Sequence, residues 1–189
     1  MQRKRGASAN GVDWAIDKAA LLKGGAWGPF HEIGHNHQSG DWTPAGYGEV
    51  TVNLFSCLAI TEVCGLDVRC PASLVNLDAQ KPRIEAFKRS KRTYDDLKRD
   101  VFLALEPYVR VVEAYGWDVF RKTFAAYHAP GFQKPKTDVE RWNVFLTLMS
   151  EACGADIATP FAAWGVPVDQ AVRDACAAKY PKAPESLLP

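Results

Sequence analysis

No apolar run in this 189-residue sequence approaches the roughly 20 residues that a membrane-spanning helix needs, so we expect no membrane span. The basic start, MQRKRGASANGVDW, is not followed by an apolar segment and therefore does not have the form of a signal peptide. The sequence also lacks an excess of charge of either sign, with 23 basic and 22 acidic residues. The net charge of +1 argues against nucleic acid or an anionic membrane as the main partner.

The five cysteines form no C-x-x-C pair, which argues against a zinc–thiolate site. They are Cys57, Cys64, Cys70, Cys153 and Cys176. Because five is an odd number, they cannot all pair within the chain. We expect buried free thiols, with a disulfide between Cys64 and Cys70 as the alternative.

Regular polar–apolar alternation, which is typical of strands, is scarce, and apolar residues recur instead at helical spacing. We therefore expect a mainly α-helical fold with little or no β-sheet. The expected helices are one capped by Asp13 and ending before Gly24, then 27–38, 49–65, 93–105, 107–115, 117–129, one capped by Asp138, 157–165 and 169–180. The expected loops are 39–48, 66–82 and 130–137, and the tail 181–189 is expected to be loosely held. The basic stretch 81–100 is interspersed with acidic residues, which indicates a solvated helix face.

Three of the four histidines lie between residues 31 and 37, and His31-Glu32-Ile33-Gly34-His35 matches H-E-x-x-H. Residues four apart on a helix lie one turn apart on the same face. His31 and His35 can therefore bind one tetrahedral Zn²⁺. Glu32 is about 100° further round the helix, the position of a general base. His37 should project from the opposite side and is not expected to bind the same ion.

A catalytic zinc needs a third protein ligand and one open position. The nearest acidic residues downstream are Asp41 and Glu49. Glu49 is favoured because it begins an apolar helix after a glycine-rich turn, whereas Asp41 lies in the loop itself. Asn53, one turn after Glu49, is expected to orient a ligand. The alternative is a helical protein in which the motif arose by chance.

The segments WGPFHEIGHNHQ and GYGEVTVNLFS resemble those of the enhancin-like, mucin-targeting metallopeptidases, which are gluzincins. The residues that carry the likeness are Trp27, Gly28, His31, Glu32, Gly34, His35, Gln38, Gly46, Glu49, Val50, Thr51 and Asn53. It continues through EAYGWDVFRKTFAAYH and RWNVFLTLMSEACGADIATPFAAWGVPV, so it spans roughly residues 25–168.

The resemblance implies a zinc-dependent endopeptidase that acts on mucin-like glycoproteins. One Zn²⁺ would be held by His31, His35 and Glu49, with Glu32 as the base that activates water. Further candidates to line or support the site are Gln38, Trp42 and Tyr47. The resemblance also implies secretion or a cell-surface location.

Members of this family carry a β-sheet lobe before the zinc helix, including an edge strand that pairs with substrate. Only 30 residues precede His31 here. We therefore expect residues 1–189 to be a single domain, the C-terminal, zincin-like helical portion of a catalytic domain without that lobe. The surface normally covered by the sheet could drive self-association. The alternative function is a truncated, catalytically inactive zinc-binding or assembly module.

Overall fold

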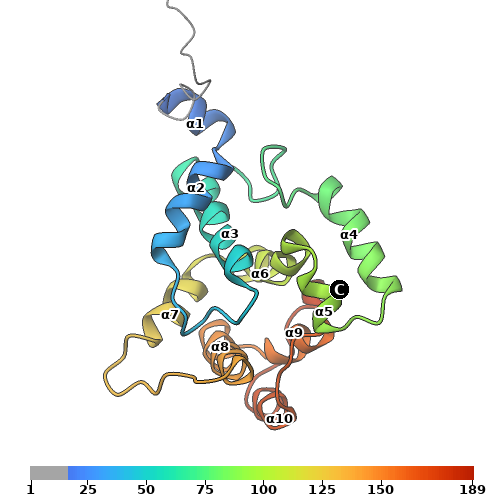
Figure 1. The fold of residues 1–189 in the computed structure, drawn as a ribbon. Coiled ribbons are helices and arrows are strands. Elements are labelled where there is room, and N and C mark those ends of the chain that lie inside the picture. Colours follow the sequence, from blue (N-terminus) through green and yellow to red (C-terminus); the bar gives the residue numbers. More distant parts are fainter. Residues whose placement is uncertain (1–16) are drawn as a thin grey trace, which may run out of the picture.

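The computed structural model describes residues 17–189, which fold as helices joined by loops (Figure 1). These residues contain no β-strand, and a single bridge between Asp156 and Lys182 is their only sheet-like pairing. The prediction of a mainly helical fold is confirmed. No helix of the described residues is long and apolar enough to cross a membrane.

Ten α-helices follow one another within the described residues. They are α1 (Lys18–Gly24), α2 (Trp27–Gly34), α3 (Gly48–Leu58), α4 (Leu77–Arg89), α5 (Tyr94–Lys98), α6 (Val101–Tyr115), α7 (Asp118–Ala126), α8 (Asp138–Cys153), α9 (Ala158–Ala163) and α10 (Gln170–Lys179). Two 3-10 segments cover His35–His37 and Glu185–Leu187, and a π-helical turn over Ala59–Val63 extends α3.

Helix α6 lies at the centre and contacts α3, α4 and α5 (Figure 1). Every residue from Leu103 to Val109 is buried, as expected for a helix surrounded by others. Pro107 was predicted to start this helix but lies inside it. Asp100 accepts hydrogen bonds from the backbone N–H groups of Phe102 and Leu103 and so begins the helix earlier. Packing on all sides holds α6 together despite the N–H group that proline lacks.

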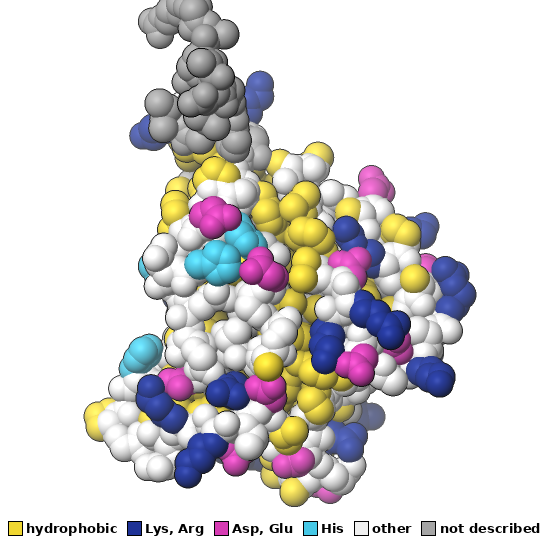
Figure 2. Space-filling view, in the orientation of Figure 1, with side chains coloured by type: hydrophobic (Ala, Val, Ile, Leu, Met, Phe, Trp, Pro, Cys, Tyr) yellow, Lys and Arg dark blue, Asp and Glu magenta, His cyan; other side chains and the backbone are white. Residues whose placement is uncertain are grey.

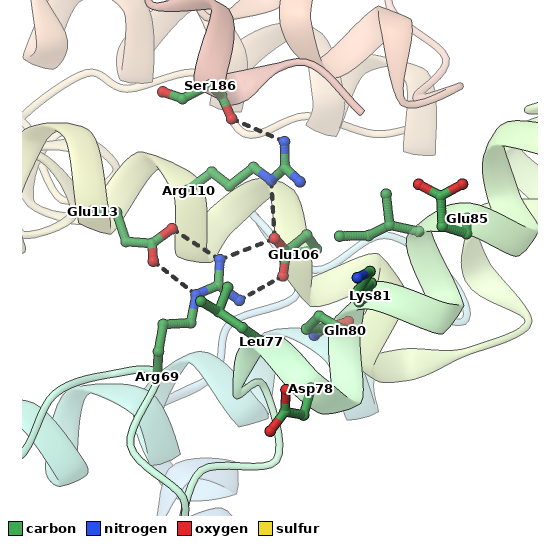
Figure 3. A pocket seen from close by; sticks show the side chains of 11 residues that line it. Arg69, Leu77, Asp78, Gln80, Lys81, Glu85, Glu106, Arg110, Glu113 and Ser186 are labelled. Carbon is green, nitrogen blue, oxygen red and sulfur yellow. Dashed lines mark hydrogen bonds and ion pairs between the residues drawn. The ribbon is translucent and has the colours of Figure 1, made fainter.

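A buried carboxylate on α6 holds the loop that precedes α4 (Figure 3). Glu106 is only 1% exposed and accepts hydrogen bonds from Arg69 Nη1 and Nη2 at 2.7 and 2.9 Å and from Arg110 Nε at 2.9 Å. Arg69 also pairs with Glu113. Burial lowers the pKa of Arg69, but its hydrogen bonds to Glu113 and Glu106 outweigh this and raise it overall. The Arg69 guanidinium therefore stays charged and ties the loop before α4 to α6.

The last residues are also docked, so the prediction of a loosely held tail is wrong. Arg110 Nη1 donates to the carbonyl oxygen of Ser186 at 2.9 Å and to that of Leu188. The indole of Trp164 donates to the carbonyl oxygen of Leu187 at 2.7 Å, and the Leu187 side chain is buried. These contacts join segments far apart in sequence, which local patterns do not record.

Other differences from the sequence-based expectations concern helix starts and thiols. Residues 66–82 were predicted as a loop, but α4 begins at Leu77 because the Asn76 side chain caps it. Thr137, and not Asp138, caps α8. Asp17 caps α1, whereas the predicted cap Asp13 lies outside the described residues. All five cysteines are free, so the alternative disulfide is absent.

Helices α2 and α3 approach each other closely at Gly34. A Cβ atom there would lie 2.9 Å from Val52 Cγ2, 3.0 Å from Phe55 Cβ and 3.0 Å from the Val52 carbonyl oxygen. Glycine is thus required for packing, because any side chain would push the two helices apart. Gly28, on the same helix, has no such neighbour within 4 Å.

We predict that Gly34→Ala lowers the free energy of unfolding by about 1–3 kcal/mol because it overpacks the α2–α3 contact. The matched Gly28→Ala control should instead be neutral or stabilising by up to about 1 kcal/mol, the helix-propensity difference between glycine and alanine. Urea denaturation measures both. Equal stabilities for the two variants would contradict the close packing.

Candidate metal centre

Three side chains from α2, the 3-10 segment that follows it and α3 converge at the surface. His31 lies on α2, His35 begins the 3-10 segment that continues it, and Glu49 lies in the first turn of α3. Their candidate ligand atoms all lie within 4.8 Å of one another, and Glu49 Oε2 is 3.1 Å from His31 Nε2. Figure 2 shows histidine and acidic side chains together on this face. The structure thus brings together the three predicted ligands.

Asn53 anchors the first histidine. Its Oδ1 atom accepts hydrogen bonds from the Trp27 indole at 2.9 Å and from His31 Nδ1 at 2.8 Å. Its Nδ2 group donates to the backbone carbonyl oxygen of Glu49 at 2.7 Å, which fixes the orientation of the amide. Because this amide oxygen can only accept, His31 Nδ1 must carry a proton.

Gln38 anchors the second histidine in the same manner. Its Oε1 atom lies 2.9 Å from His35 Nδ1, and its Nε2 group donates at 2.6 Å to the Gly48 carbonyl oxygen and to Thr51 Oγ1. The amide orientation is again fixed by a backbone carbonyl, so His35 Nδ1 is a donor. Asn53 thus supports His31 directly from α3, and Gln38 supports His35 while being held in place by Gly48 and Thr51 of α3.

With the proton on Nδ1, the neutral form of each imidazole carries its lone pair on Nε2, and both Nε2 atoms face the Glu49 carboxylate. Lone pairs facing a carboxylate repel it, and a cation between them removes the repulsion. Two ligand atoms that each lie about 2.1 Å from one zinc are at most about 4.2 Å apart, so the group must contract slightly to bind. Glu49 can supply that movement because its side chain is 64% exposed. The residues fit a divalent metal with two imidazoles and one carboxylate.

The neighbouring polar residues take other positions. Glu32 is exposed on α2, and within the described residues no hydrogen bond or ion pair holds its side chain. The His37 ring lies against Phe55, with centroids 5.7 Å apart. Asp41, the alternative third ligand, pairs with Lys134 at 3.0 Å. Neither His37 nor Asp41 belongs to the three-residue cluster.

Trp42 and Tyr47, two candidates to line the site, have their side chains in the core. Trp42 packs on Phe124 and Tyr127, and Tyr47 stacks on Tyr94. Burial, followed by the nearby Tyr94, raises the pKa of the Tyr47 hydroxyl well above its ordinary value. The hydroxyl therefore stays protonated. These contacts support the loop that leads into α3. The role of Trp42 and Tyr47 in lining the metal centre stays a prediction.

The sequence did not reveal what Trp27, Gly34 and Thr51 do. Trp27 shares the acceptor of His31, Gly34 sets the distance between the helices, and Thr51 accepts from Gln38. The signal available for Trp27 was its position four residues before His31, one turn away on the same face. Nothing in the local pattern indicates the other two contacts.

Residues 10–165 match the family described as Peptidase M60, enhancin and enhancin-like, and the chain belongs to this metallopeptidase family. Among its relatives, human TRPM8 channel-associated factor 2 is 31% identical over 163 residues, which is 86% of this chain and 17% of that protein. The zebrafish TRPM8 channel-associated factor homolog is 33% identical over 162 residues, which is 81% of this chain and 17% of that protein.

A solved structure is similar as well. It belongs to a functionally unknown conserved protein from Bacillus anthracis, with a TM-score of 0.74 and 26% identity, and the match covers 95% of this chain and 36% of that one. The chain thus spans about a sixth of the length of these curated relatives and about a third of the solved structure.

We predict that Asn53→Ala weakens binding of a divalent metal by about 10–100-fold, the usual effect of losing a residue that orients a histidine ligand. Zn²⁺ titration against a competing chelator measures the affinity. Asn36→Ala is the matched control, because Asn36 is exposed and makes one long hydrogen bond, of 3.3 Å, to the Ile33 carbonyl oxygen. Equal affinities for the two variants would show that Asn53 does not orient His31.

Proposed function

We propose that this chain is the metal-binding part of a zinc peptidase that cleaves glycoprotein backbones of the mucin type. The observation that carries the proposal is the pair of histidines whose Nδ1 atoms are both engaged by fixed amides, with both Nε2 atoms directed at one carboxylate. Such pre-orientation is typical of metal ligands and serves no evident purpose in a purely structural cluster.

Zinc is the metal that this donor set fits best. Two imidazoles and one carboxylate, with a fourth position open to solvent, form the composition of catalytic zinc sites in peptidases. His31, His35 and Glu49 would hold the ion. When bound, Zn²⁺ supplies Lewis-acid chemistry, because it polarises carbonyl oxygens and acidifies water.

Glu32 is the residue that we assign to proton transfer. It lies next to His31, and its exposed carboxylate has no partner within the described residues, so it is free to accept a proton from water. The same carboxylate can then give the proton to the leaving amine. The exposure of Glu49 leaves the open side of the site accessible to an extended peptide.

The substrate class and the location are proposed from the family resemblance. Enhancin-like members are the source of the mucin-type proposal, and an extracellular or cell-surface site of action stays a prediction. A second candidate function is supported by the relatives named TRPM8 channel-associated factors. Their names describe association, so a zinc-stabilised binding or assembly module is the alternative.

We predict that Glu32→Gln reduces hydrolysis of a mucin-type glycopeptide by about 10²–10⁴-fold, the usual contribution of general acid–base catalysis, while one zinc per chain is retained. Product formation by mass spectrometry and zinc content by atomic emission measure the two effects. Glu151→Gln, an exposed glutamate on α8, is the control and should leave turnover unchanged.

Undiminished turnover in Glu32→Gln would reject its role as the base. Stoichiometric zinc without any hydrolysis by the unmodified chain would favour the assembly module.

A further inference from the structure

A short basic segment comprises the end of α4 and the residues that lead to α5. Residues 88–92, KRSKR, which we call the basic turn, carry four cationic side chains in five positions and no acidic one. All five residues are exposed. With a net charge of only +1 over the whole chain, this is a strong local concentration of positive charge.

The acidic residues nearest in sequence do not neutralise the basic turn. Asp95 pairs with Lys98 at 2.8 Å, and Asp96 pairs with Arg99 at 3.3 Å. Glu85 reaches only Lys88, at 4.0 Å. Arg89, Lys91 and Arg92 make no side-chain hydrogen bond or ion pair with any of residues 17–189. Their charge is therefore available to an external partner.

The basic turn is held in a defined conformation. Arg92 has a φ of 54°, the only positive value among the described residues other than glycine. The adjoining backbone packs against Gly165, where a Cβ atom would lie 2.5 Å from the Arg92 carbonyl oxygen. Ser90 Oγ donates to the Phe87 carbonyl oxygen and accepts from Arg92 N–H. A non-glycine residue kept in this region often marks a functional segment.

We propose that the basic turn binds the sulfate and carboxylate groups of acidic glycan chains on the substrate. This inference rests on the proposed function for the identity of the glycoprotein. Guanidinium groups form paired, charge-assisted hydrogen bonds with such oxyanions. Figure 2 shows Lys and Arg side chains over α4 and α5 on the same face as the histidine cluster, across an apolar strip. One extended glycoprotein can therefore contact both regions.

Two other polyanions fit the basic turn less well. Single-stranded nucleic acid is usually bound by exposed aromatic side chains on which bases stack, and residues 88–92 contain none. A membrane-binding segment usually carries apolar side chains among the basic ones, and residues 88–92 contain none. An acidic glycan can be bound by the Lys and Arg side chains of the basic turn alone.

The test compares the binding of one sulfated, sialylated mucin glycopeptide with that of the same peptide after removal of both acidic groups. The protein is the zinc-loaded Glu32→Gln chain, so no turnover is needed. The variant Arg89→Gln/Lys91→Gln/Arg92→Asn removes three charges, with asparagine chosen because it tolerates positive φ. Lys122→Gln/Lys136→Gln/Lys182→Gln removes the same charge from other exposed positions.

We expect the basic-turn variant to lose affinity for the acidic glycopeptide by roughly tenfold, an effect that added salt diminishes, while the control variant changes little. Neither set should alter the weak binding of the neutral peptide. The pair Arg89→Gln/Lys91→Gln, which leaves Arg92 in place, should lose part of the affinity and guards against misfolding of the triple variant.

Equal loss in the basic-turn and control variants would overturn the inference. Tighter basic-turn-dependent binding of a single-stranded oligonucleotide, or of phosphatidylserine vesicles, would overturn it in favour of those partners. Binding is measured without catalysis, so the two proposals can fail separately. A chain that binds the acidic glycopeptide but does not hydrolyse it would contradict the peptidase proposal and still support glycan binding by the basic turn.

Discussion

The Asn53 side-chain amide is the contact on which the geometry of the site depends. One oxygen atom receives the hydrogens of Trp27 and His31, and the amide nitrogen is fixed by the Glu49 backbone. Asn53 thus sets the tautomer of His31 on α2. It is also hydrogen-bonded to the backbone of Glu49, another candidate ligand, on its own helix α3. Gln38 repeats the arrangement for the second histidine. Both supports are neutral amides, so the carboxylates Glu32 and Glu49 remain the charged groups available to balance a divalent cation.

The rest of the fold keeps these two helices at a fixed separation. Helix α3 is buried along most of its length and packs on the central α6, so it forms a rigid base. Helix α2 lies on the outside, and the contact at Gly34 determines how closely it approaches. The site therefore combines well-anchored histidines with an exposed Glu49 and an exposed Glu32. A rigid support of this kind holds site residues in a defined geometry.

The parts of the site that follow from local spacing could be predicted from the sequence, and the parts that depend on distant contacts could not. The four-residue spacing of His31 and His35 predicted their pairing, whereas Glu49 was favoured over Asp41 by its position at a helix start and by the family resemblance. Pro107 reads as a helix start, yet burial on all sides keeps α6 continuous through it. The docked position of Leu187 depends on hydrogen bonds from Arg110 of α6 and from Trp164, which follows α9. Tertiary packing overrode local preference in both cases.

Anomalous diffraction at the zinc edge, from crystals grown with one equivalent of Zn²⁺, tests the central claim most directly. The account predicts one strong peak, bound by the Nε2 atoms of His31 and His35 and by the Glu49 carboxylate, with both Nδ1 atoms still held by Asn53 and Gln38. A peak elsewhere, or none in the presence of zinc, would contradict the assignment of these residues as a metal centre.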